Sequence, residues 1–140
     1  MEKYYCQLPR YRQGSTLELF VYGIKPRSES FTIRVFVGLD SPDHTTKTCG
    51  NPHYVNDIYM YGFGASLDKK GRFIEGTEAY EEHLVDAPAF NVILDLKSLY
   101  QLYDPLPTQL KFSFVPVSTK ENFPLADECF AFDHLTISSR

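Results

Sequence analysis

The stretch FTIRVFVG at residues 31–38 decides the fold class. Its apolar side chains alternate from Phe31 to Val37, and this period-two pattern predicts a half-buried β-strand. LELFVYG at 17–23 is a second run of β-branched and aromatic residues. The intervening IKPRSES carries a proline and two serines and has the length of a hairpin loop. The first third of the chain therefore indicates two consecutive strands.

Four later segments carry similar strand signals. They are DIYMYGFG (57–64), FNVILDL (90–96), LKFSFVPV (110–117) and CFAFDHLTIS (129–138). In the third of them, Pro116 predicts that the strand ends there or lies at a sheet edge. In the last, Asp133 and His134 are neighbours, and we expect one of them to face solvent.

The 57–64 segment has an unusual distribution of apolar residues. Ile58 and Met60 point to one side of the expected strand, and three aromatic residues point to the other: Tyr59, Tyr61 and Phe63. Because both faces are apolar, we expect a central strand or a second face that a partner covers.

Helical signals are few. One lies at 96–104, where leucines and tyrosines have helical spacing and Pro105 stops the helix. Another short turn is expected at 76–84, with Thr77 as its N-cap. Residues 65–89 otherwise form the longest irregular stretch.

These elements predict an all-β fold in one domain spanning residues 1–140. The expected architecture is a single β-sandwich or jelly-roll-like barrel of six to eight mostly antiparallel strands with one or two short helical turns. A chain of 140 residues, 43% of them hydrophobic, can bury one core without disulfide or metal support.

Charge and hydropathy exclude several classes of partner. The net charge is −4 and no stretch is strongly basic, so we expect no nucleic-acid partner. No run reaches the roughly 18 apolar residues of a membrane helix, so we expect no membrane partner. No apolar segment follows the first positive charges, which predicts a cytoplasmic location.

The chain also has few signals for catalysis or metal binding. Four histidines occur without HxH or HxxxH spacing, and three cysteines without a CxxC pair. We expect reduced thiols, with Cys129 buried. The weak metal candidates are Cys49 and His53 in TCGNPH, but the residues between them are ordinary turn formers. No nucleophile sits in a recognised catalytic context, so the sequence does not predict an enzyme.

Several of these segments resemble the C-terminal domain of plant-type polyphenol oxidases, named for its Lys-Phe-Asp-Val strand. LFVYGIKPRSESFTIRVFVG is similar to the start of that domain, although residues 32–35 keep only the valine. NPHYVNDIYMYGFG looks like the next strand. FNVILDLKSLYQLYDPLPTQLKFSFVPV is similar to a strand, a Leu-rich turn and a strand closing on Val-Pro, and CFAFDHLTIS to the final strand. The resemblance spans about 17–138, with 65–89 longer than expected.

The resemblance implies a function without catalysis. Type-3 copper oxidases, such as tyrosinases, hold their copper pair with six histidines on a helical bundle, whereas this chain has four histidines and little helix. The family's C-terminal sandwich covers the copper cavity, keeps the oxidase latent and can assist copper loading. The resemblance thus implies a regulatory domain or subunit with no cofactor of its own, whose partner holds copper. Candidate plug or partner-contact residues are His53 and Tyr54, on a loop that follows the TCGNP turn and precedes the 57–64 strand, and Phe73 and Ile74 in the long irregular stretch.

Two other interpretations remain open at this stage. One is a general protein-interaction or ligand-binding sandwich, C2-like and unrelated to copper. The other is an enzyme whose site would show as a pocket holding perturbed titratable groups.

Overall fold

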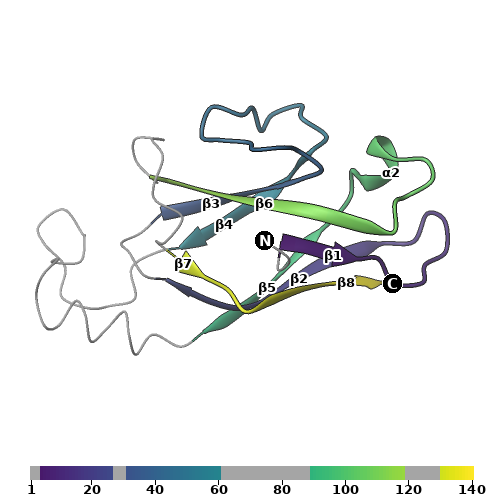
Figure 1. Ribbon diagram of the computed structural model, residues 1–140, viewed down its shortest axis with the longest axis horizontal. Coiled ribbons are helices and arrows are strands. Elements are labelled where there is room, and N and C mark those ends of the chain that lie inside the picture. The colour runs from purple at the N-terminus through teal and green to yellow at the C-terminus, as the bar shows by residue number, and fades with distance from the viewer. Residues whose placement is uncertain (1–3, 27–30, 61–88, 119–129) are drawn as a thin grey trace, which may run out of the picture.

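A computed structural model describes residues 4–26, 31–60, 89–118 and 130–140 (Figure 1). Most of this part of the chain is β-structure, with one short helix. The elements are β1 (Tyr5–Gln7), β2 (Leu17–Pro26), β3 (Phe31–Val37), β4 (Tyr54–Met60), β5 (Phe90–Asp95), α2 (Leu99–Leu102), β6 (Gln109–Ser118), β7 (Phe130–Ala131) and β8 (His134–Ser139).

The strands form two antiparallel sheets that lie as two layers (Figure 1). The first sheet has the order β1-β6-β3-β4. In the second, β2 pairs with β5 on one side and with β8 and then β7 on the other. The described strands do not close into a barrel. The predicted all-β sandwich of six to eight strands is confirmed, and the barrel alternative does not apply to this part of the chain.

The core fills the space between the two layers. From the first sheet, Phe31, Ile33, Val35 and Val37 enter it with essentially no exposed surface, as their alternation predicts. The second sheet contributes the alternate residues of β2, β5 and β8. They are Leu17, Leu19, Val21, Leu94, Leu135 and Ile137.

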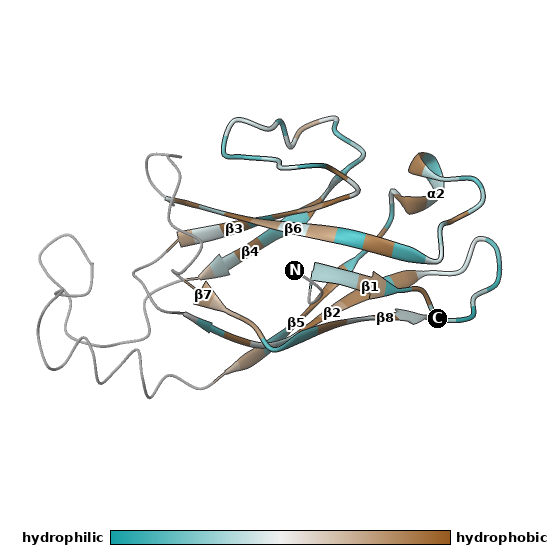
Figure 2. Cartoon of the chain, viewed as in Figure 1, coloured by the Kyte–Doolittle hydropathy of each residue, from teal (hydrophilic) through white to brown (hydrophobic). Residues whose placement is uncertain are grey.

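The other face of β3 is also buried. Phe36 points away from the core and is 0% exposed. The loop at 38–53 follows β3 directly, and Nη1 of Arg34 donates a hydrogen bond of 3.0 Å to the carbonyl of His44 within it. This loop is mostly hydrophilic, whereas β6 shows alternating bands of hydropathy (Figure 2). β3 is therefore covered on both faces.

β4 differs from the prediction in where it begins and in its place in the sheet. It begins at Tyr54, so this tyrosine lies in the strand and not on a loop before it. Ile58 and Met60 face the core and Tyr59 faces away, as expected. Among the described strands, however, β4 pairs only with β3 and lies at the sheet edge, and Tyr59 is 57% exposed. The described strands therefore do not place β4 at the centre of its sheet, and the alternative, that a partner covers its second face, stays a prediction. Tyr61 and Phe63 lie outside the described residues.

β2 and β3 do not form the expected hairpin. β2 continues to Pro26 and pairs with strands of the second sheet, whereas β3 pairs with β4 and β6 in the first. The chain therefore changes layer between them. Both arrangements bury one face of each strand in the same core, so apolar alternation alone cannot distinguish them.

β6 continues through Pro116 to Ser118, so the strand does not end at its proline as one alternative predicted. β1 pairs only with Gln109–Lys111, and β3 pairs along the opposite side of β6. The carbonyl of Lys111 accepts a hydrogen bond from Gly38 beside β3, so the backbone groups of Pro116, five residues later, point the other way. β6 lies between β1 and β3 and is therefore not an edge strand, but no described strand pairs with it beside Pro116 on the side away from β3, so the missing amide proton is not needed there.

The remaining elements are shorter than expected. α2 is a single turn within the predicted 96–104 segment. The predicted last strand divides into β7 and β8, with Phe132 and Asp133 between them. The predicted helical turn at 76–84 and nearly all of 65–89 lie outside the described residues. In the part of the chain that is described, no helix is long and apolar enough to cross a membrane.

Candidate functional site

The outer face of the second sheet carries a row of aromatic and apolar side chains. Because Leu19 and Val21 point into the core, Phe20 and Tyr22 point away from it. The strand register places Ile93 of β5 opposite Phe20 and His134 of β8 opposite Tyr22. We call these four residues the outer aromatic face.

The rings of the outer aromatic face are stacked. The Phe20 and Tyr22 centroids lie 6.0 Å apart with ring planes at 16°, and those of Tyr22 and His134 lie 4.4 Å apart at 13°. Ile93 is 55% exposed, which makes it, with Tyr59, one of the most exposed large apolar residues in the described regions. The mutual stacking holds the rings in fixed positions on the sheet.

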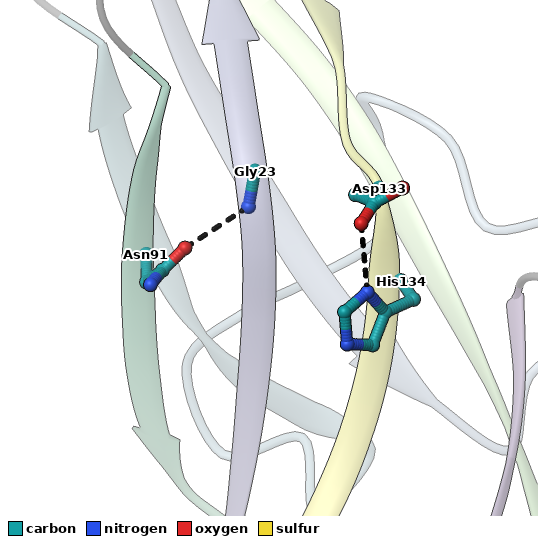
Figure 3. Close-up of polar contacts among 4 residues, drawn as sticks. All are labelled: Gly23, Asn91, Asp133 and His134. Atoms are coloured by element: carbon teal, nitrogen blue, oxygen red, sulfur yellow. Dashed lines mark hydrogen bonds and ion pairs between the residues drawn. The ribbon is translucent and has the colours of Figure 1, made fainter.

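A polar rim borders the outer aromatic face where β2 is irregular (Figure 3). The amide of Gly23 donates to Oδ1 of Asn91 at 3.0 Å, and the amide of Asp133 donates to the carbonyl of Tyr22 at 2.7 Å. Gly23 has φ +69°, and a Cβ at this position would lie 2.8 Å from Cβ of Asp133. Only glycine permits this approach of β2 to the break between β7 and β8 without strain.

Asp133 and His134 form an ion-pair geometry on this rim. Oδ2 of Asp133 lies 3.0 Å from Nδ1 of His134, and the two side chains are 76% and 54% exposed respectively. One of these two side chains was expected to face solvent, and in the structure both do. Asp133 precedes β8, so strand alternation does not apply to it.

The weak metal candidates, Cys49 and His53, lie away from the outer aromatic face, in the loop at 38–53. His53 is partly buried, and its Nδ1 lies 2.8 Å from the carbonyl of Val37. The carbonyl of its neighbour Pro52 accepts a hydrogen bond from Oγ of Ser98 at 2.5 Å. Cys49 is an exposed free thiol. Within the described ranges, no three His, Cys, Asp or Glu residues are grouped to hold a metal ion.

Tyr54, a candidate plug residue, is partly buried in the sheet. Its ring centroid lies 5.8 Å from that of Phe36, and its hydroxyl bonds to Asp57. Burial, and then the Asp57 carboxylate, raise the pKa of the Tyr54 hydroxyl well above its usual value. Oδ1 of Asp57 is buried and has no hydrogen-bond partner among the described residues. Tyr54 therefore packs against its own sheet, and the other two candidates, Phe73 and Ile74, lie outside the described residues.

The outer aromatic face was not among the predicted sites, although the sequence contains its signal. In LELFVYG, Phe20 lies between the core-facing Leu19 and Val21, and Tyr22 follows Val21 on the same outer face. A one-sided strand would place polar residues there. The aliphatic residues on one face of this strand and the aromatic residues on the other were the available indication of a contact surface.

No protein-family model matches the chain, and no curated protein matches it.

Proposed function

We propose that this chain is a non-catalytic β-sandwich that binds a protein partner through the outer aromatic face. The observation that carries the proposal is the outer row of Phe20, Tyr22, Ile93 and His134, in which Ile93 and His134 are exposed and the stacked rings of Phe20 and Tyr22 are partly exposed. An apolar, aromatic centre bordered by polar groups is the usual composition of a protein interface. Exposed apolar patches with a polar rim mark interaction sites on soluble proteins.

We further propose that the partner is a type-3 copper oxidase, which the sandwich covers and keeps latent. The support is the resemblance in strand patterns over about 17–138, together with the all-β sandwich architecture that the resemblance implies. In this role the copper belongs to the partner. Covering the substrate entrance excludes phenols by competition, and a domain tethered to the oxidase acts at high effective concentration.

The test is capture from the native source with the tagged chain as bait, with diphenol oxidase activity and copper content as readouts. Phe20→Thr and Ile93→Thr remove apolar surface from the outer aromatic face and place a β-branched residue, which favours strands, at each position. Tyr59→Thr is the matched control, because Tyr59 is 57% exposed, close to the 55% of Ile93, but lies on the other sheet.

The proposal expects recovery of a latent oxidase that becomes active when the complex is disrupted. Phe20→Thr and Ile93→Thr should weaken capture by about tenfold or more, as truncation of a hot-spot residue does, and Tyr59→Thr should not. Capture of other proteins without copper, still lost in the two face variants, would replace the copper role with that of a general interaction sandwich. Capture that survives both face variants would refute the assignment of the surface.

A further inference from the structure

Asp133 is fixed at the edge of the outer aromatic face by its backbone. Its amide donates to the carbonyl of Tyr22, and its Cβ would lie only 2.8 Å from a Cβ at Gly23. This hydrogen bond holds the backbone of Asp133 beside Tyr22. Oδ2 of Asp133 also holds the imidazole of His134, which is stacked on Tyr22.

A partner that covers Tyr22 must therefore remove water from Asp133 as well. The Asp133 side chain is 76% exposed, and its Oδ2 lies 3.0 Å from Nδ1 of the His134 imidazole. An ionised carboxylate that loses water without gaining a matching partner is strongly destabilised. One imidazole contact at Oδ2 leaves the other oxygen of Asp133 to be satisfied from the partner's side.

We infer that the partner places a cationic side chain, a guanidinium by preference, against Asp133 at the edge of the outer aromatic face. This inference rests on the proposed function, since it describes what the covering protein must present. A guanidinium suits the site better than an ammonium because it pairs with carboxylate oxygens through a planar fork and stacks on aromatic rings. The amide of Asn91, whose Oδ1 accepts from Gly23, orients its Nδ2 donor on the opposite side of β2.

The first experiment uses a tetra-arginine peptide amide as the probe and follows amide signals of the complete chain by ¹H–¹⁵N NMR. Asp133→Asn removes the charge and keeps the shape of the side chain. Asp104→Asn is the control, because Asp104 is exposed and lies outside the second sheet. The peptide should shift the signals of Gly23, Asp133 and His134 in the wild type and in the control.

Asp133→Asn should weaken binding of the peptide by about threefold to fivefold, the range of an exposed ion pair. Tetra-lysine should bind less tightly than tetra-arginine. Equal affinity of tetra-arginine for the wild type and Asp133→Asn, or shifts confined to other regions, would overturn the inference.

The second experiment measures binding of the protein captured through the outer aromatic face. There Asp133→Asn should weaken binding by at least about tenfold, since the pair is desolvated in the complex. The peptide titration needs no oxidase, so a failed capture contradicts the proposed function and leaves the peptide result standing. Capture that is lost in Phe20→Thr and Ile93→Thr but unchanged in Asp133→Asn would refute the proposed cationic side chain and leave the proposed interface standing.

Discussion

Replacement of Gly23 by alanine tests the closest approach of the backbone in the second sheet. Gly23 has φ +69°, and the added Cβ would meet Cβ of Asp133 at 2.8 Å. Two other glycines provide matched controls. Gly14 and Gly50 have φ +83° and +72°, and a Cβ at either position meets no atom within 4 Å.

The magnitude follows from separating backbone strain from the steric clash. A non-glycine residue in the left-handed region costs about 1–2 kcal/mol, which is the whole effect expected for Gly14→Ala and Gly50→Ala. At Gly23 the clash adds about 1–3 kcal/mol, as overpacking does. Asp133 cannot retreat easily, because its amide bonds to the carbonyl of Tyr22 at 2.7 Å. The expected total for Gly23→Ala is about 2–5 kcal/mol.

Equilibrium urea unfolding provides the assay, with the three alanine variants measured beside the wild type. The midpoint should fall most for Gly23→Ala, with an unchanged m-value if the folded and unfolded states keep their compactness. A free energy of unfolding for Gly23→Ala equal to that of Gly50→Ala would refute the reasoning, since it would show that the contact with Asp133 adds nothing beyond backbone strain.

Three further predictions concern the outer face of the first sheet. Phe36→Ala should destabilise the protein by about 3–5 kcal/mol, as much as Phe112→Ala in the core, because both rings are 0% exposed. A loss below about 1 kcal/mol in thermal or urea unfolding would show that the loop at 38–53 does not exclude water from the Phe36 ring. Tyrosine ordinarily ionises near pH 10, whereas the pKa of Tyr54 is raised in the folded state. Above about pH 10 the unfolded chain therefore loses this proton more readily than the folded protein, and the free energy of unfolding should fall as pH rises. Tyr54→Phe should lose less stability than the wild type between pH 9 and 12. Asp57→Asn should lower the pKa of Tyr54, measured by NMR titration of ¹³Cζ-labelled tyrosine; an unchanged titration would remove Asp57 as a cause.

The positions of the strands could be predicted from the sequence because each strand buries at least one face. The alternation from Phe31 to Val37 and the run from Phe90 to Asp95 identify β3 and β5 with nearly correct bounds. Pairing was harder to predict. β2 and β3 are consecutive and similarly apolar, yet they belong to different sheets. A strand can bury its apolar face in the same core from either sheet, so the apolar pattern does not say which sheet the strand joins.

β1 and the break between β7 and β8 escaped prediction for a related reason. β1 has three residues and buries only Cys6, so it has no periodic pattern to detect. The break depends on Gly23, which is distant in sequence from Asp133 and allows the two backbones to approach. A contact of this kind has no local signature.

The candidate site could be predicted only in part. His53 and Tyr54 attracted attention because a histidine and an aromatic residue follow a turn, but hydrogen bonding and packing hold both within the sandwich. The outer aromatic face depends on cross-strand neighbours such as Tyr22 and His134, which become adjacent only through the register of β2 and β8.

The pairing of β2 with β8 also affects how the chain can fold during synthesis. Ser15 and Ser139, which share a hydrogen bond beside these strands, are 124 positions apart. At about 5–20 residues per second, a ribosome needs on the order of 10 s to make the intervening chain. Throughout that interval the apolar residues of β2, such as Leu19 and Val21, lack the strand that completes their sheet. A nascent chain of this topology therefore presents an unfinished sheet edge to chaperones until β8 has left the exit tunnel.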